Sequence, residues 1–166
     1  MNIQQLFKQG MDREIPELLE ANEFLPSVDL GASGVKRYAN IALGLPDWDF
    51  PRDPIPFEQG SVGTVHAYHF LEHLTGEEAI KLLREVERVL APGGVMNIAV
   101  PYYNSLMQAQ DLTHKSVWCG TTIQTLFNNA YYDPAGEWQL KLHTQFIMGI
   151  VEHNMALFIQ LVKPEA

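Results

Sequence analysis

The sequence predicts a single three-layer α/β domain, with a mostly parallel central sheet that ends in an antiparallel C-terminal hairpin. Three observations carry this prediction. A capped helix lies between two short apolar runs, the C-terminal tail alternates in hydropathy, and the chain has 166 residues. Domains with one hydrophobic core commonly contain on the order of 100 to 150 residues, so we expect residues 1–166 to form one unit.

A helix is predicted from Gly76 to Leu90. Thr75 is followed three residues later by Glu78, which is the pattern of a capping box at a helix N-terminus. Pro92, Gly93 and Gly94 end the helix. Apolar residues recur at helical spacing and mark one buried face: Ala79, Leu82, Leu83, Val86, Val89 and Leu90.

Strands are predicted on both sides of this helix, at Val62–Ala67 and Val95–Val100. Both runs are short and apolar, with the Val and Ile content typical of strands buried on two faces. A helix between two such strands is a right-handed crossover that joins parallel neighbours.

The N-terminal segment, residues 1–25, shows two short helical patterns, at residues 2–9 and 15–25. Pro16 suits the first turn of the second helix, and we expect Leu18, Leu19 and Phe24 to face the core. The segment then packs on the sheet, and a lid over a ligand is the alternative interpretation.

The next two predicted strands are joined by an unusually short connection. Seven residues, 32–38, separate the apolar run that begins at Val28 from the candidate strand Ala39–Leu43. A parallel crossover normally needs a dozen or more residues, so the first crossover is shortened. Prolines at positions 51, 54 and 56 argue against a long third strand.

The second half of the chain supplies a loop, a helix and a hairpin. Residues 102–118 show neither the helical nor the strand period of apolar residues. They leave the carboxyl edge of the sheet, where open α/β folds bind substrates. A helix capped near Gly120 is predicted at Thr121–Asn129. The alternating segments Trp138–Ile150 and Asn154–Lys163 predict the hairpin.

Composition narrows the classes of partner. The net charge of −9 disfavours nucleic acid, since phosphate binding needs Lys and Arg. No apolar run approaches the roughly 20 residues that span a bilayer. The single cysteine, Cys119, suits a reducing cytoplasm. We therefore expect a cytoplasmic protein with a small-molecule or protein partner and no membrane. The outer edge of the hairpin and Trp138 offer a contact for a homodimer.

The central stretch also carries a family resemblance. HFLEHL at residues 69–74, REVERVLAPGG at 84–94 and the strand that closes in Val100-Pro101 resemble class I S-adenosylmethionine-dependent methyltransferases. The similarity runs with gaps from about Val28 to about Phe127. The chain is similar to small stand-alone methyltransferase-like proteins of bacteria and their phages. The resemblance implies a Rossmann-like methyltransferase fold and S-adenosylmethionine as cofactor.

The resemblance also implies a cofactor site at the end of the first strand. Asp29 would orient the glycine loop or the methionine end of the cofactor, which Gly31 would face, and Ala32 and Ser33 continue that loop. Missing side chains let backbone N–H groups approach a ligand. The loop departs from the family pattern because Ser33 and Val35 stand at glycine positions.

The carboxylates expected around the ribose and adenine are displaced. Ala42 stands where the family has its ribose-binding acid, so Asp47 or Asp49 would substitute for it. A carboxylate suits the task because it accepts two hydroxyl protons at once. Asp47 and Asp49 are also explained as ordinary turn residues. Asp53 resembles the acid near the adenine amino group, with Trp48 or Phe57 beside the ring.

Candidates for substrate contact or proton transfer follow the strands. We expect His69 at the carboxyl end of the strand Val62–Ala67 to face the ligand. In the segment 102–118, Asp111 and His114 are candidates, together with Tyr102 and Tyr103. A histidine takes up a proton near neutral pH, and a neighbouring acid holds its tautomer. An Asp-x-x-His turn held by its own hydrogen bonds is the alternative.

Residues 69–73 match the zinc motif H-x-x-E-H, in which His69 and His73 would bind the metal and Glu72 would act as base. We assign no metal to it. The motif belongs within a helix, whereas this segment precedes the Thr75 cap at a strand end, and a third ligand would have to come from elsewhere.

Three functional interpretations remain, and the least supported is a zinc hydrolase based on the H-x-x-E-H match. The first is methyl transfer from S-adenosylmethionine to a small molecule or protein side chain. The second is a methyltransferase-like binding or scaffold protein without catalysis, suggested by Ser33, Val35, Ala42 and Gly63 and by the shortened crossover, because fold does not establish activity.

Overall fold

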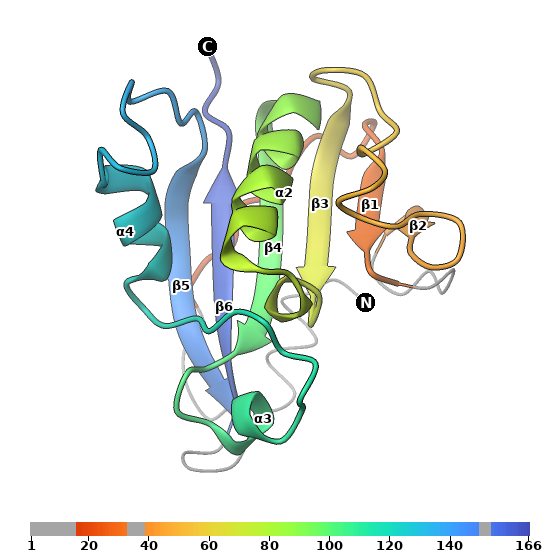
Figure 1. Cartoon of the computed structure of the whole chain (residues 1–166). Coiled ribbons are helices and arrows are strands. Elements are labelled where there is room, and N and C mark those ends of the chain that lie inside the picture. The colour runs from red at the N-terminus through yellow and green to blue at the C-terminus, as the bar shows by residue number, and fades with distance from the viewer. Residues whose placement is uncertain (1–15, 33–38, 150–153) are drawn as a thin grey trace.

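The described part of the chain forms a six-stranded mixed sheet with helices packed on it (Figure 1). This computed structural model describes residues 16–32, 39–149 and 154–166. The helix expected at residues 2–9, and Ser33 and Val35, lie outside them. The strand order is β2-β1-β3-β4-β6-β5. Strands β1 to β4 run parallel, and β6 is antiparallel to both β4 and β5. The α/β fold with a parallel sheet and a C-terminal hairpin is thereby confirmed.

The element bounds are as follows. The strands are β1 Ser27–Leu30, β2 Ile41–Leu43, β3 Val62–Tyr68, β4 Leu90–Pro101, β5 Lys141–Gly149 and β6 Met155–Val162. The helices are α2 Gly76–Val89, α3 Leu106–Ala109 and α4 Thr122–Asn128, and Leu71–His73 is a turn of 3-10 helix, η1.

The predicted capping box starts α2. Thr75 Oγ1 accepts from the Glu78 amide at 3.2 Å, and Glu78 Oε2 accepts from the Thr75 amide at 2.9 Å. The helix ends at Val89, because Leu90 is already extended and pairs with Val62. Strand β4 therefore begins five residues before the predicted Val95, and the Pro92-Gly93-Gly94 turn signal lies inside it.

The main core lies between the sheet and α2. Helices α2 and α4 cover the same face of the sheet (Figure 1). Alternate residues along a strand point to opposite faces. On this face Val28, Val65 and Met96 lie in register and join the buried face of α2.

The opposite face carries a row of buried polar side chains, Asp29, His66, Asn97 and Gln160, in register across β1, β3, β4 and β6. Gln160 Nε2 donates to Asn97 Oδ1 at 2.8 Å, and the Asn97 amide lies 3.4 Å from His66 Nδ1. Gln160 also binds the amide and carbonyl of Leu19, at 2.8 and 3.0 Å. The N-terminal segment thus crosses this face.

That segment differs from the prediction. Residues 16–25 form no helix, because the backbone of Leu19 hydrogen-bonds to Gln160 on the sheet. Leu18 is buried as expected, but Leu19 is 39% exposed and Phe24 is 89% exposed. The predicted core-facing positions of Leu19 and Phe24 are therefore wrong.

The first crossover is short, since only residues 31–40 join β1 to β2. Residues 44–61 form turns without a strand, as the prolines predicted. Helix α3, in contrast, lies in a stretch for which no helix was predicted. Trp138 is 3% exposed beneath the Arg84 guanidinium, at 3.5 Å, and offers no surface for the expected homodimer contact.

No helix among the described residues is both long enough and apolar enough to cross a bilayer.

Candidate functional site

The carboxyl ends of β1, β3 and β4 meet at one edge of the sheet, beside α3 (Figure 1). From β1 the chain proceeds to β2 on one side and then to β3 on the other. This reversal is a topological switch point, and open α/β sheets bind ligands in the crevice outside it. Gly31, after β1, and His69, after β3, flank this position.

Gly31 adopts a left-handed conformation with φ of +79°. A Cβ at this position would lie 2.7 Å from Phe70 Cδ2, which is closer than real Cβ contacts. Only glycine fits here without strain. The amides of Gly31 and Ala32 both donate to the Leu43 carbonyl, at 2.8 and 3.2 Å. These two donors are therefore engaged in the β1–β2 connection.

Asp29 is 5% exposed and lies opposite His66 and Ala42 in the sheet. Asp47 is exposed in a turn. Both carboxyl oxygens of Asp53 are bound within its own turn, to the Arg52 guanidinium at 2.7 and 3.1 Å and to the Asp49 amide at 2.9 Å. The Arg52 hydrogen bond, helped by that amide, lowers the pKa of Asp53.

Trp48 is part of the core. It is 5% exposed, its indole N–H donates to the Pro54 carbonyl at 3.0 Å, and its ring lies 5.9 Å from that of Phe70. Phe57, the other residue expected beside adenine, is partly buried against the core.

The described residues fit S-adenosylmethionine in part. Gly31 lies at the switch point, although Phe70 fills the side on which a Cβ would lie, and Asp29 provides a buried carboxylate two residues before it. The amides of Gly31 and Ala32 and the carboxylate of Asp53 serve local structure.

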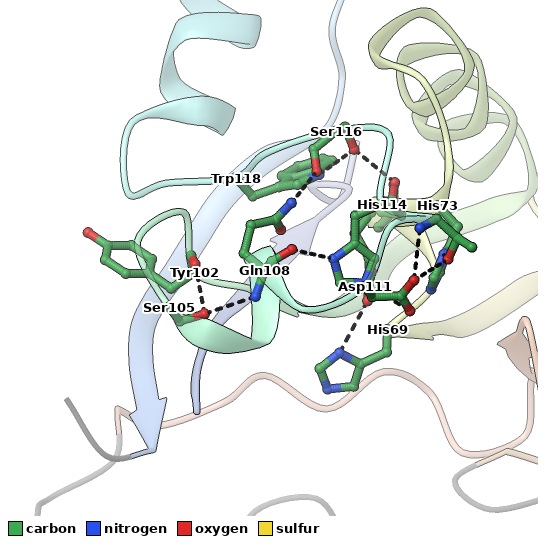
Figure 2. Close-up of polar contacts among 12 residues, drawn as sticks. His69, His73, Tyr102, Ser105, Gln108, Asp111, His114, Ser116 and Trp118 are labelled. Carbon is green, nitrogen blue, oxygen red and sulfur yellow. Dashed lines mark hydrogen bonds and ion pairs between the residues drawn. The ribbon is translucent and has the colours of Figure 1, made fainter. Parts of the chain in front are cut away.

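A second group of titratable side chains lies at the same edge (Figure 2). His69, Glu72, His73, Asp111 and His114 line a cavity of about 220 Å³. The structure thus brings together the three residues predicted for catalysis, His69, Asp111 and His114, and adds Glu72 and His73. We call these five residues the histidine cluster.

The segment that carries His114 is tied to η1. The Lys115 amide donates to the Glu72 carbonyl at 2.7 Å, and Ser116 Oγ donates to the Leu71 carbonyl at 3.0 Å. The Trp118 indole donates to Ser116 Oγ at 2.9 Å (Figure 2). These contacts place His114, which is 41 positions after His73, beside that residue, with 5.0 Å between ring centroids.

Asp111 and His114 form the turn described by the alternative interpretation. The His114 amide donates to the Asp111 carbonyl at 3.3 Å, and Asp111 Oδ1 accepts from the hydroxyl and amide of Thr113. These Thr113 hydrogen bonds lower the pKa of Asp111. Between the side chains, His114 Nε2 lies 3.7 Å from Asp111 Oδ2, too far for a hydrogen bond.

His69 is the accessible histidine of the cluster, with its side chain 50% exposed, against 7% for His114. Its φ of +53° is uncommon for a residue with a Cβ. Such conformations cost on the order of 1–3 kcal/mol and concentrate at functional sites. The His69 amide bonds to the Ala99 carbonyl at 2.8 Å, and Nδ1 lies 3.2 Å from Glu72 Oε1.

The tyrosines predicted for substrate contact flank this group. The Tyr102 amide donates to the Met155 carbonyl at 2.8 Å, and Tyr103 is 51% exposed. Helix α3 contributes Met107 to the cavity, and Gln110 follows it. Sequence reasoning missed this helix. The signal was Ser105 followed three residues later by Gln108, a capping pattern, and Ser105 Oγ accepts from the Gln108 amide at 3.3 Å.

A larger cavity, of about 650 Å³, lies between α2 and α4 and includes Cys119. Hydrogen bonding by Thr121 lowers the pKa of the Cys119 thiol. Among the residues that the structure describes, none of those predicted for the cofactor or for catalysis lines this cavity.

Comparison with known proteins agrees with this architecture. Residues 49–98 match the family model described as "Methyltransferase domain". A comparison with curated proteins gives no match.

Several solved structures share the fold. One comes from the complex between the Haloferax volcanii Trm112 methyltransferase activator and a methyltransferase, with 16% identity, a TM-score of 0.57, and 92% of this chain and 86% of that chain covered. A Thermotoga maritima S-adenosylmethionine-dependent methyltransferase has 11% identity and a TM-score of 0.56, over 83% and 82% of the two chains. One from Mesorhizobium loti has 15% identity and a TM-score of 0.54, over 89% and 93%. This chain therefore has the class I S-adenosylmethionine-dependent methyltransferase fold, and its sequence resemblance to that family is confirmed.

Proposed function

We propose that this protein transfers a methyl group from S-adenosylmethionine to a small-molecule or protein side-chain acceptor. The observation that carries the proposal is the position of Gly31, left-handed and without a side chain, at the switch point of a methyltransferase-like sheet. Ligands of open α/β folds bind at this place. The net charge of −9 favours such acceptors over nucleic acid.

The proposed cofactor site joins Asp29, Gly31, Ala32 and Ser33 with Asp47 or Asp53. S-adenosylmethionine supplies a methyl group that is already activated by a sulfonium, so the protein mainly orients the acceptor and takes up a proton. Asp47 is exposed and available to ribose hydroxyls, whereas Asp53 must first exchange Arg52 for the ligand.

His69 is the proposed base. If Nδ1 carries its proton, it donates to Glu72 Oε1 at 3.2 Å and Nε2 keeps a lone pair on the accessible side of the ring. Asp111 and His114 complete the proposed acceptor site, and they contribute through position because His114 is nearly buried.

A second candidate function, a binding or scaffold protein without catalysis, is favoured by one observation. The amides of Gly31 and Ala32, which would face a cofactor, donate instead to Leu43. In this alternative the methyltransferase-like fold serves only to present a surface.

Calorimetry with S-adenosylhomocysteine separates the two functions. If the protein is a methyltransferase, we expect binding with a Kd in the micromolar range, which corresponds to about −8 kcal/mol. Asp29→Asn keeps the size of a buried side chain while removing its charge, and we expect it to weaken binding at least about tenfold, or about 1.4 kcal/mol. Glu58→Gln, at an exposed position in the irregular stretch 44–61, is the matched control.

The alternative gains support if the folded wild-type protein binds no cofactor at millimolar concentration. Circular dichroism of the same samples establishes that the protein is folded. Equal affinity of Asp29→Asn and the wild type would remove Asp29 from the proposed site.

A further inference from the structure

Three side chains of the histidine cluster have the arrangement of a metal site. Glu72 and His73 come from η1 and His114 comes from the segment after α3, and one ligand atom from each lies within 4.8 Å of the other two. All three line the cavity of about 220 Å³ at the carboxyl edge. Figure 2 labels His73 and His114. We propose that Glu72, His73 and His114 bind a divalent transition-metal ion.

The first reason for proposing a metal ion is the carboxylate of Glu72. Its side chain is 1% exposed. Oε1 has His69 as its partner, but Oε2 is buried without a hydrogen-bond partner among the residues that the structure describes. A buried polar oxygen without a hydrogen-bond partner is unfavourable. A cation bound by Oε2 would supply the missing partner.

The second reason is the orientation of the two imidazoles. His114 Nδ1 lies 3.0 Å from the Gln108 carbonyl, which can only accept, so Nδ1 is the donor and, in the neutral ring, Nε2 keeps its lone pair. His73 Nδ1 lies 3.1 Å from Thr113 Oγ1, and the Thr113 hydroxyl donates to Asp111 Oδ1 at 2.7 Å. Thr113 therefore accepts from His73, which also leaves Nε2 unprotonated.

These outer contacts are those that hold metal-binding histidines in proteins. A ligating histidine donates its second N–H to a carbonyl, a carboxylate or a hydrogen-bonded group, which fixes the tautomer and ring orientation. His73 and His114 each have such an acceptor, and the His69 ring hydrogen-bonds to the carboxylate of Glu72.

The donor set selects the class of metal. Two imidazoles and one carboxylate suit Zn²⁺, Mn²⁺, Fe²⁺ or Co²⁺, whereas Mg²⁺ and Ca²⁺ prefer oxygen ligands alone. A tetrahedral ion with bonds of about 2.0 Å holds its ligand atoms about 3.3 Å apart, so the side chains close by up to about 1.5 Å on binding. Three protein ligands leave a coordination position open to the cavity. An acceptor oxygen would bind there, a role that rests on the proposed methyl transfer.

This site differs from the one that the H-x-x-E-H motif suggested. That motif would use His69 and His73 as ligands one helical turn apart. In the structure His69 precedes η1, has a φ of +53° and directs Nδ1 at Glu72. The carboxylate therefore takes the place of His69 as a ligand, and His114 supplies the third donor.

The test uses the full chain, stripped of metal with a chelator and free of cofactor, and titrates it with Co²⁺ and Zn²⁺. We expect one ion per chain by calorimetry, with a visible d–d absorption band for bound Co²⁺. Glu72→Gln, His73→Ala and His114→Ala should each weaken binding at least tenfold. His143→Ala is the matched control, because this exposed histidine contacts the Glu17 carbonyl away from the cluster.

The proposal is overturned if the folded wild-type chain binds neither ion, or if His73→Ala and His114→Ala keep wild-type affinity. Should Glu72→Gln fail to fold by circular dichroism, the two histidine variants decide the outcome. S-adenosylhomocysteine binding is measured separately, so a chain that binds cofactor without metal, or metal without cofactor, identifies which of the two proposals has failed.

Discussion

Gly31 is constrained both by its positive φ and by a close neighbour, whereas Gly60 is constrained by its positive φ alone. Gly31 has a φ of +79° and an ideal Cβ there meets Phe70 at 2.7 Å, whereas Gly60 has a φ of +69° with no heavy atom within 4 Å of its Cβ position. Both positions disfavour an L-residue by backbone conformation. Only Gly31 adds a steric conflict.

We therefore expect Gly31→Ala to lower the free energy of unfolding more than Gly60→Ala. The backbone term is about 1–2 kcal/mol in both, and overpacking against Phe70 adds about 1–3 kcal/mol at Gly31 alone. Urea denaturation measures each difference. Combining Gly31→Ala with Phe70→Leu should recover part of the loss, as expected for residues in contact. Equal costs for the two glycines would show that Phe70 yields without strain.

At the scale of elements, α2 holds the irregular stretch 44–61 against the fold. Arg88 donates to the carbonyls of Phe57 and Ile55 at 2.7 and 2.9 Å, and Glu85 Oε2 accepts from the Ile55 amide at 3.2 Å. The hydrogen bond from Arg88 lowers the pKa of Glu85. Side chains of a helix thus satisfy backbone groups that a third strand would have paired.

Arg88→Lys tests this attachment. A lysine has one ammonium group and cannot reproduce the fork that reaches two carbonyls and Glu85 together. We expect a loss of about 1–2 kcal/mol in the free energy of unfolding and faster limited proteolysis within residues 44–61. Lys81→Arg is the control, because Lys81 is exposed on the same helix. Wild-type cleavage rates in Arg88→Lys would place the attachment elsewhere.

At the scale of the whole molecule, the buried polar row makes stability depend on pH. Burial lowers the pKa of His66 from 6.5 to about 4. The unfolded chain therefore binds a proton below pH 6.5, while the folded chain resists it until about pH 4. The unfolded state binds more protons across this window, so stability falls as the pH falls.

We expect His66 to remove about 2 kcal/mol from the free energy of unfolding between pH 7 and pH 5. Urea denaturation at both pH values measures the change. His66→Gln keeps hydrogen bonding but cannot titrate, so its change over the same interval should be smaller by about this amount. Parallel pH profiles for the two proteins would contradict the assignment of this effect to His66.

Much of this architecture could be predicted because local signals agreed with the tertiary fold. The Thr75 capping box, the stripe on α2 and the Val-rich strands all point to one arrangement. Residues 16–25 could not be predicted, because their conformation depends on Gln160, about 140 positions away, rather than on helical periodicity.

The candidate site, too, could be predicted only in part. Its position at the carboxyl edge followed from the predicted parallel strands and the loops after them, and His69, Asp111 and His114 do meet there. The contact between His73 and His114 is long-range, and no periodicity reveals it. The engagement of Asp53 by Arg52 and of the Gly31 amide by Leu43 was likewise invisible, since hydrogen-bond partners depend on how turns close.

The two edge strands of the sheet differ in their ability to pair with a further strand. At one end β2 has only three residues, too short to template a further strand, while at the other end β5 has nine. Two molecules could therefore pair their sheets through β5. The β2 strands would then lie at the two outer edges of the joined sheet and would add no further strand. Self-association by this route ends with a closed pair, β5 against β5, and does not extend into a fibre.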